Sequence, residues 1–256
     1  MVTIIVTEIW KWKRNKTVWA ILILTTLLGV FAVERACHIS RNSPLMDSFG
    51  DLYTLAFKSL ISLFLPIVLG IFSTTLFFDE HKNDTLKALL TIPISKTQLY
   101  FSKVAVVTSM SMGLSLFIFA FCIAGGLIAG GFPDFNVETV MQAGLLFIAG
   151  GVLVPIALLP IVFLAALSKG YVLPIGATLL YLTPVIIAPS ALIGIHPLAS
   201  MLGIYACISD PALEMAESWT YMKITTVPSG VCMLSMILIG AVSAALSVVA
   251  LQKQSY

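Results

Sequence analysis

The residue types that most often carry catalysis or bind metals are few in this chain and show no functional spacing. Three histidines and four cysteines form no C-x-x-C pair, and the adjacent Cys37 and His38 alone do not make a metal site. The sequence has no G-x-x-x-x-G-K-[ST] motif for nucleotide phosphates, no H-E-x-x-H and no G-x-S-x-G. We therefore expect no catalytic residue, no metal and no cofactor on this chain.

Ionisable side chains are also scarce in the apolar part of the sequence. Between Val104 and Ser209 the charged residues are Asp134, Glu138 and Lys169, and all three fall between apolar runs. Carriers driven by protons or ions usually depend on ionisable groups within the membrane. The pattern argues against such a carrier and favours energy supplied by a partner.

The polar segment after the second apolar run combines helix signals with a leucine face. Asn83 or Asp84 is a suitable N-cap, and Leu86, Leu89 and Leu90 follow at helical spacing. A solvated loop would not need three leucines on one face. We predict a short amphipathic helix that docks a cytoplasmic partner; a helix packed only on its own bundle is the alternative.

Two signals mark the end of this helix and the start of the next one. Pro93 ends the short helix, because proline disfavours a helical conformation in the residue before it. Ser95 and Gln98 form an S-x-x-Q capping box, which predicts that the third apolar helix begins there.

The side-chain pattern of residues 1–16 predicts a helix that lies on the inner membrane surface. Its apolar face is formed by Val2, Ile5, Ile9 and Trp12, and its polar face by Thr3, Thr7, Lys11 and Arg14. Tryptophan and basic residues suit the headgroup layer and anionic lipid. The alternative is a positively charged flank that only sets topology, and no cleavable signal peptide is expected.

Composition places most of the chain in lipid. The 256 residues are 59% hydrophobic and 10% charged, with a mean hydropathy of +1.04, and so few charges cannot cover a water-facing surface. The net charge of +2 does not indicate nucleic-acid binding. We predict an all-α integral membrane protein, one domain over 1–256, with spans at about 17–33, 59–78, 104–130, 139–167, 171–195 and 229–251.

Lys and Arg set the orientation, because they concentrate on the inner side of bacterial membranes. With the N-terminus inside, the outer segments and span ends hold only Arg35, Arg41, Lys58 and Lys223. The inner segments hold Lys11, Lys13, Arg14, Lys16, Lys82, Lys87, Lys96, Lys103, Lys169 and Lys253. We predict a multi-pass protein of the cell membrane with both termini in the cytoplasm.

The stretch 174–228 is the hardest to assign, because four prolines interrupt its apolar run. One span followed by a re-entrant or interfacial segment fits best, and a seventh span is the alternative. Cys37 and Cys207 fall in expected outer loops, so a disulfide between them stays open, with free thiols favoured. Gly126, Gly130, Gly144, Gly150 and Gly151 in spans three and four favour close packing within the chain over a dimer seam.

The segment after span two resembles the permease subunits of type-two ABC exporters. The matching residues are Glu80, Asn83-Asp84-Thr85, the run from Leu89 to Lys96 that contains Pro93, and Lys103. The opening residues 1–14 resemble those of bacitracin-resistance and lantibiotic-immunity permeases. Asp84 stands where many relatives have glycine, and Lys96 where arginine is common.

The resemblance implies a mechanism and an assembly. The coupling helix around Thr85 to Leu90 would seat in a cytoplasmic ATP-binding subunit, with Glu80, Asp84, Thr85, Leu86, Leu89, Leu90 and Pro93 as the coupling residues. The interfacial helix would contribute Ile5, Ile9, Lys11, Trp12 and Arg14. Two permeases, identical or homologous, would work with two ATPases, and ATP would bind only the partner.

The cargo follows from resemblance alone: an amphipathic peptide antibiotic removed from the membrane. Export of a lipid or polysaccharide intermediate is one alternative. A membrane module that anchors or senses without transporting is another.

Overall fold

The computed structural model describes residues 2–42, 48–82, 95–129, 132–168, 170–208 and 227–253. All regular structure in these ranges is helical. The helical runs long and apolar enough to cross a membrane are Lys16–Glu34, Phe49–Phe78, Lys96–Ile128, Val137–Ala157 and Ser229–Lys253, and a shorter apolar helix is Val172–Ile187. The predicted all-α integral membrane fold is confirmed.

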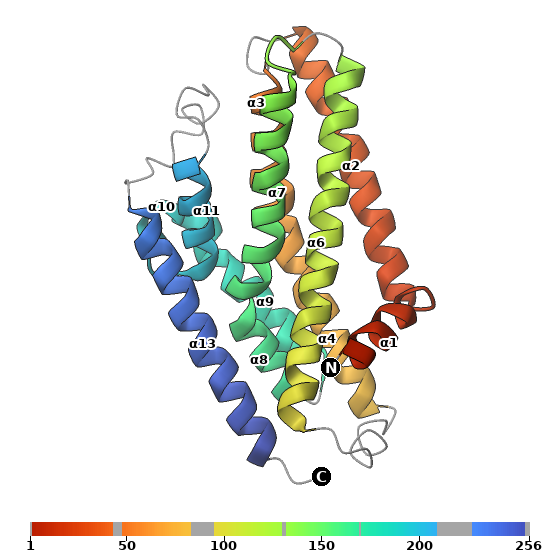
Figure 1. Ribbon diagram of the computed structural model, residues 1–256, viewed down its shortest axis with the longest axis vertical. Coiled ribbons are helices and arrows are strands. Elements are labelled where there is room, and N and C mark those ends of the chain that lie inside the picture. The colour runs from red at the N-terminus through yellow and green to blue at the C-terminus, as the bar shows by residue number, and fades with distance from the viewer. Residues whose placement is uncertain are drawn as a thin grey trace.

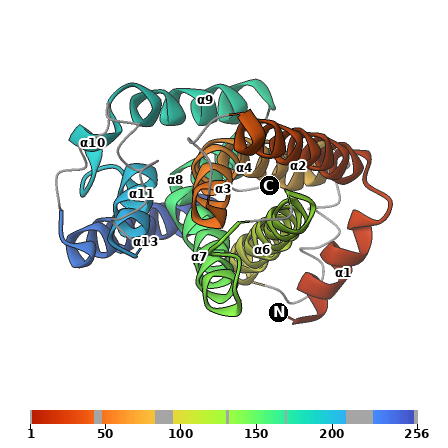
Figure 2. The ribbon, with the colours of Figure 1, turned by 90° about the horizontal axis from the view of Figure 1, so that it is seen from above.

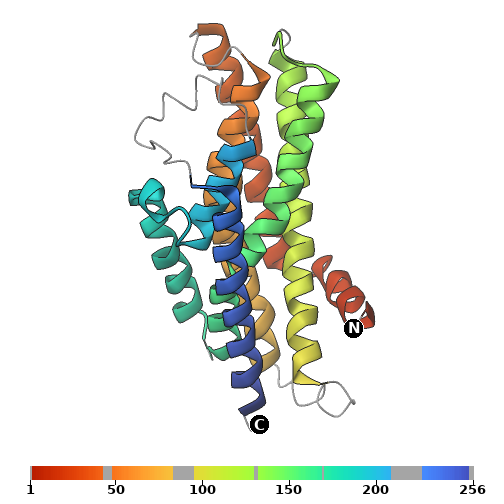
Figure 3. The ribbon, with the colours of Figure 1, turned by 60° about the vertical axis from the view of Figure 1, so that its left-hand side comes forward.

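The long helices run side by side along the long axis (Figure 1). They are α2 (Lys16–Asn42), α4 (Leu65–Lys82), α6 (Lys96–Ala129), α7 (Val137–Ala157) and α13 (Ser229–Lys253). The short α1 (Val2–Trp12) lies outside this bundle beside α6, on the side opposite α9 (Figure 2). We call the end of the bundle where α4 and α13 stop and α6 begins the lower end; α1 lies toward it (Figure 3).

The second membrane-length run begins ten residues earlier than predicted. It consists of α3 (Phe49–Ala56), the π-helix η2 (Phe57–Phe64) and α4 without interruption. Ser48 caps α3 by accepting a hydrogen bond from the amide of Asp51 at 3.1 Å. The helix that carries the predicted span 59–78 therefore begins ten residues before that span, and Lys58 lies inside a helix.

A carboxylate from a distant loop holds the start of α3. The two oxygens of Asp134 accept hydrogen bonds from the amides of Phe49 and Gly50 at 2.6 and 2.9 Å. The first amides of a helix lack partners within the helix, and a negative charge there is stabilising. Asp134 thus joins the α6–α7 connection to α3 at the upper end.

The fourth predicted span is two helices, α7 and α8 (Leu159–Leu167), separated at Leu158. Pro160 has no N–H to donate to the fourth residue before it, and the amide of Ile161 bonds Leu158 instead. The hydroxyl of Tyr181 donates to the freed carbonyl of Ala157 at 2.8 Å. The helical hydrogen bonding is thus broken between α7 and α8.

The fifth predicted span corresponds to α9 (Val172–Ile187), followed by α10 (Pro189–Leu192) and α11 (Pro197–Ile208). Helix α11 lies inside the bundle, between α13 and α7, and the hydroxyl of Tyr205 donates to Thr54 at 2.8 Å. With 12 residues α11 is too short for a seventh span, and its burial fits a re-entrant rather than an interfacial segment. Residues 209–226 lie outside the described ranges.

Neither cysteine expected in an outer loop is in one. Cys37 belongs to α2 and Cys207 to α11, although their side chains lie outside the description. Cys122 and Cys232 are buried free thiols. The prediction that Cys37 and Cys207 lie in loops is therefore wrong.

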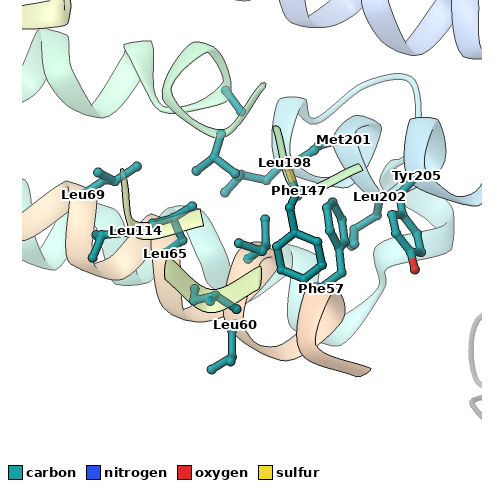
Figure 4. Close-up of a cluster of buried hydrophobic side chains, with 14 of the residues drawn as sticks. Phe57, Leu60, Leu65, Leu69, Leu114, Phe147, Leu198, Met201, Leu202 and Tyr205 are labelled. Atoms are coloured by element: carbon teal, nitrogen blue, oxygen red, sulfur yellow. The ribbon is translucent and has the colours of Figure 1, made fainter. Parts of the chain in front are cut away.

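An aromatic cluster joins η2 to its neighbours at mid-bundle (Figure 4). Phe57 stacks on Tyr205 with ring centroids 4.1 Å apart and meets Phe147 edge-on at 5.9 Å. A Cβ on Gly150 would approach Phe57 and Ile61 to 2.9 Å, so glycine permits this contact between α7 and η2. The expected packing of glycines within the chain is confirmed here.

Most hydroxyl groups inside the helices are bonded within their own helix. The hydroxyls of Thr25, Thr108, Thr178 and Ser243, among others, each donate to the carbonyl four residues earlier, at 2.7–3.0 Å. Such bonding conceals the polar hydrogen from an apolar environment. The apolar character of these helices is thus greater than their serine and threonine content suggests.

Candidate functional site

The candidate site is the lower end of the bundle, where the predicted coupling segment joins α4 to α6. Asp84, Thr85, Leu86, Leu89, Leu90 and Pro93 lie outside the described residues. Glu80 belongs to the last turns of α4, although its side chain is not described. The structure therefore describes the frame of this segment: the two helices that it connects and the groups that hold them.

Lys103 is the strongest link between these two helices. The side chain extends from α6 and is 1% exposed. Its ammonium donates to the carbonyl of Leu76 on α4 at 2.8 Å and lies 4.3 Å from the centre of the Phe77 ring. A buried lysine is stable only when its charge meets acceptors or an aromatic face, and α4 provides both.

The start of α6 is fixed by the predicted capping box, which is confirmed. The amide of Gln98 donates to the hydroxyl of Ser95 at 3.2 Å, and the amide of Ser95 donates to the Gln98 side chain at 3.4 Å. Lys96 then donates to the carbonyl of Leu251 on α13 at 3.0 Å. The first turn of α6 is thereby attached to the last turn of α13.

A second apolar cluster packs behind these polar links. Phe77 and Tyr100 lie at its centre, with ring centroids 6.3 Å apart. The other buried members are Val162, Ala165 and Ala166 from α8, with Val104, Ala244, Val248 and Leu251 around them. The cluster joins α4, α6, α8 and α13, so the helices at the lower end form one packed unit.

Helix α1 is held to the bundle by part of its predicted apolar face. Ile5 and Trp12 pack against the core, and Trp12 meets Phe72 of α4 edge-on at 5.8 Å. Ile9 is 37% exposed and points away from the core. Lys11 and Arg14 are exposed, as expected for a polar face at a membrane surface.

Glu8 is a buried charge that the sequence interpretation missed. It is 8% exposed, lies on the same face as Ile5 and Trp12, and pairs with Lys11 one turn later. The signal was available: Glu8 and Lys11 are three residues apart, a spacing that brings side chains together on a helix. The pair lets a carboxylate occupy the face that packs on the bundle.

The arrangement is suited to transmitting movement rather than to bond chemistry. In the described part of the chain, no group of three or more His, Cys, Asp or Glu could hold a metal ion. The lower end instead offers two helix ends fixed by buried contacts, with a short segment between them. A protein bound to that segment would move α4 and α6 together.

A bundle of membrane-length helices with a packed lower end defines a polytopic membrane protein. The chain belongs to the ABC-2 transporter family, whose model matches residues 4–185. It is also similar to a bacitracin transport permease protein from Bacillus licheniformis, with 33% identity over 103 residues. This match covers 40% of the chain and 49% of that protein, so it spans about half of the relative's length.

Proposed function

We propose that this chain is the permease of an ATP-driven exporter and that a separate ATP-binding subunit docks on segment 83–94. Family membership supports the role of a transport-pathway subunit. The observation that carries the coupling mechanism is the contact of Lys103 on α6 with Leu76 and Phe77 on α4, which joins the two helices that flank that segment.

The proposed working cycle follows from this attachment. Closure of the ATPase on ATP would push the leucine face of the segment, and the links to α4, α6 and α13 would pass the displacement into the membrane. Helix α1 would follow, because Trp12 packs on Phe72 of α4. The lower end would accordingly face the cytoplasm.

The proposed cargo is an amphipathic peptide antibiotic of the bacitracin type. The support is the similarity to the bacitracin transport permease protein. The apolar bundle is compatible with such a cargo, since charged side chains are rare within its spans.

A double substitution in the predicted coupling helix tests the mechanism. Leu89→Asp together with Leu90→Asp would place two unpaired charges in the docking contact, at a cost of several kcal/mol each. We expect the variant to reach the membrane at normal abundance, to lose the co-purifying ATPase and to lose bacitracin resistance in a sensitive host. Immunoblotting, co-purification and growth measure the three outcomes.

Ala88→Asp is the matched control, because position 88 lies opposite the leucine face on a helical wheel. It should retain the ATPase and the resistance. A double variant with normal abundance, ATPase retention and resistance would rule out docking at this segment. Low abundance of the double variant alone would support the alternative of a helix packed on its own bundle.

A further inference from the structure

Lys58 is the only lysine or arginine between Phe49 and Phe78, the second run of membrane length. Its ammonium has no protein partner among the described residues. It lies in the π-helix η2, nine residues after the start of α3. No hydrogen bond or ion pair involves its side chain in that part of the chain. An ionisable group within a membrane helix is costly and marks a functional site by default.

Other lysines of the bundle are satisfied by the protein. Lys103 bonds the carbonyl of Leu76, Lys96 bonds that of Leu251, and Lys11 pairs with Glu8. Lys58 differs because its side chain is only half-buried and has no such partner in the described part of the chain. The described residues therefore supply no counter-charge for its ammonium.

The position of Lys58 along the helix places it at a membrane boundary. A hydrocarbon layer of about 30 Å corresponds to roughly 20 helical residues. Counted from Phe78, where the run ends, 20 residues reach Ser59, directly next to Lys58. A lysine at this depth can extend its ammonium to the level of the lipid phosphates.

The surface around Lys58 suits a lipid. Leu63, 39% exposed, lies on the same side of the helix as Lys58, and the half-buried Leu55, which also packs against the core, lies one turn before Lys58. Ser59 and Ser62 lie on the same face, but their hydroxyls donate to the carbonyls of Leu55 and Lys58. The ammonium is thus the free donor, with apolar side chains beside it for acyl chains.

We propose that Lys58 binds the phosphate of an anionic membrane lipid in the leaflet nearer the upper end of the bundle. The charge of the ammonium complements that phosphate, and the apolar flank complements its chains. The site is independent of the coupling segment and of any cargo. It can therefore be tested on the purified chain alone.

The test compares lipid retention in nanodiscs of phosphatidylcholine mixed with phosphatidylglycerol. Native mass spectrometry would count the phosphatidylglycerol that stays on the protein. We expect Lys58→Gln to lower this preference by about fivefold, the effect of removing one cation near a lipid surface. Lys58→Arg is the matched control, because it keeps the charge at this position, and it should keep the preference.

Two outcomes would overturn the proposal. Equal phosphatidylglycerol retention by Lys58→Gln and the parent chain would show that Lys58 is no lipid site. A disulfide between two copies of a Lys58→Cys variant on a cysteine-free background would show that a second copy covers this face. Circular dichroism and monodisperse elution would establish that each variant is folded, so that loss of retention reports on binding.

Discussion

At the scale of single residues, three polar side chains bond other segments where helices meet a neighbour or lose their own hydrogen bonds. Lys103 reaches across to Leu76, Tyr181 bonds the carbonyl freed beside Pro160, and Asp134 bonds the first amides of α3. Each contact joins residues far apart in sequence. These groups therefore determine how the helices are arranged, while the apolar residues determine that the helices are in lipid.

The variant Lys103→Met tests whether the contact between Lys103 and α4 is needed for transport rather than for stability. Methionine fills a similar volume in the apolar cluster but cannot bond Leu76, a contact of a kind typically worth about 1.5–3 kcal/mol. Because replacing a buried charge by an apolar group is often tolerated, we expect near-normal membrane abundance. The proposed function predicts that bacitracin resistance falls, because α4 and α6 lose a direct link next to segment 83–94.

Lys103→Arg is the matched control, since it keeps the charge and the donors. Partial recovery of resistance with this variant would support a positioning role. Full resistance in Lys103→Met, at unchanged abundance, would show that the contact between the two helices is dispensable.

At the scale of elements, the long helices could be predicted and their interruptions could not. α2, α6 and α13 follow from uncharged apolar runs of sufficient length. Asp134, more than eighty residues away, also bonds the start of α3, and no local pattern reveals that contact. The pattern Ser48-x-x-Asp51 was a usable local signal, because the serine does cap the helix.

The contacts around the candidate site could likewise be predicted only where both partners are close in sequence. The Ser95 and Gln98 capping box is local and was recognised, whereas the partners of Lys103 and Lys96 lie on other helices. In α1 the apolar periodicity identified Ile5 and Trp12 but also assigned Ile9 to the same face. The actual packing face includes Glu8, because Lys11 neutralises it.

Tyr181→Phe tests the break between α7 and α8. Without the hydroxyl, the carbonyl of Ala157 loses its donor, and a buried unsatisfied carbonyl costs about 1–3 kcal/mol. We expect a lower midpoint of thermal unfolding for the detergent-solubilised protein, measured by dye fluorescence or circular dichroism.

Thr183→Val on the exposed face of α9 is the comparison. The Thr183 hydroxyl bonds only Leu179, a residue of its own helix, so its removal should leave the midpoint unchanged. Equal midpoints for Tyr181→Phe and the parent protein would mean that another donor satisfies the break.

At the scale of the whole molecule, the topology can be tested directly. The lower end carries α1, the end of α13 and the ends of α4 and α6, while Asp134 lies at the upper end (Figure 1). We expect single cysteines at 47, 134 and 214 to react with an impermeant reagent in intact cells, on a cysteine-free background. A cysteine at 87 should react only after permeabilisation. Labelling of position 87 in intact cells would show that the predicted orientation is wrong.

The number of permeases per complex is a second prediction at this scale. Buried apolar side chains pack between the described helices of one chain in two clusters, and we expect the transport pathway to form between chains. We expect two permeases in closed two-fold symmetry if they are identical. The mass of the solubilised complex with its ATPase would measure this, and a fully active complex holding one permease would refute it.

The hydroxyl groups bonded within their own helices have a consequence for biosynthesis. Thr25, Thr108 and Ser243 find their acceptors four residues back, so these hydroxyls are satisfied as soon as their own segment is helical. Such a segment can partition into lipid through the translocon before any neighbouring helix exists. The bonds of Lys103, Tyr181 and Tyr205 can form only afterwards, between helices that are already inserted. Membrane insertion and tertiary assembly are thereby separate stages, governed by two different sets of polar side chains.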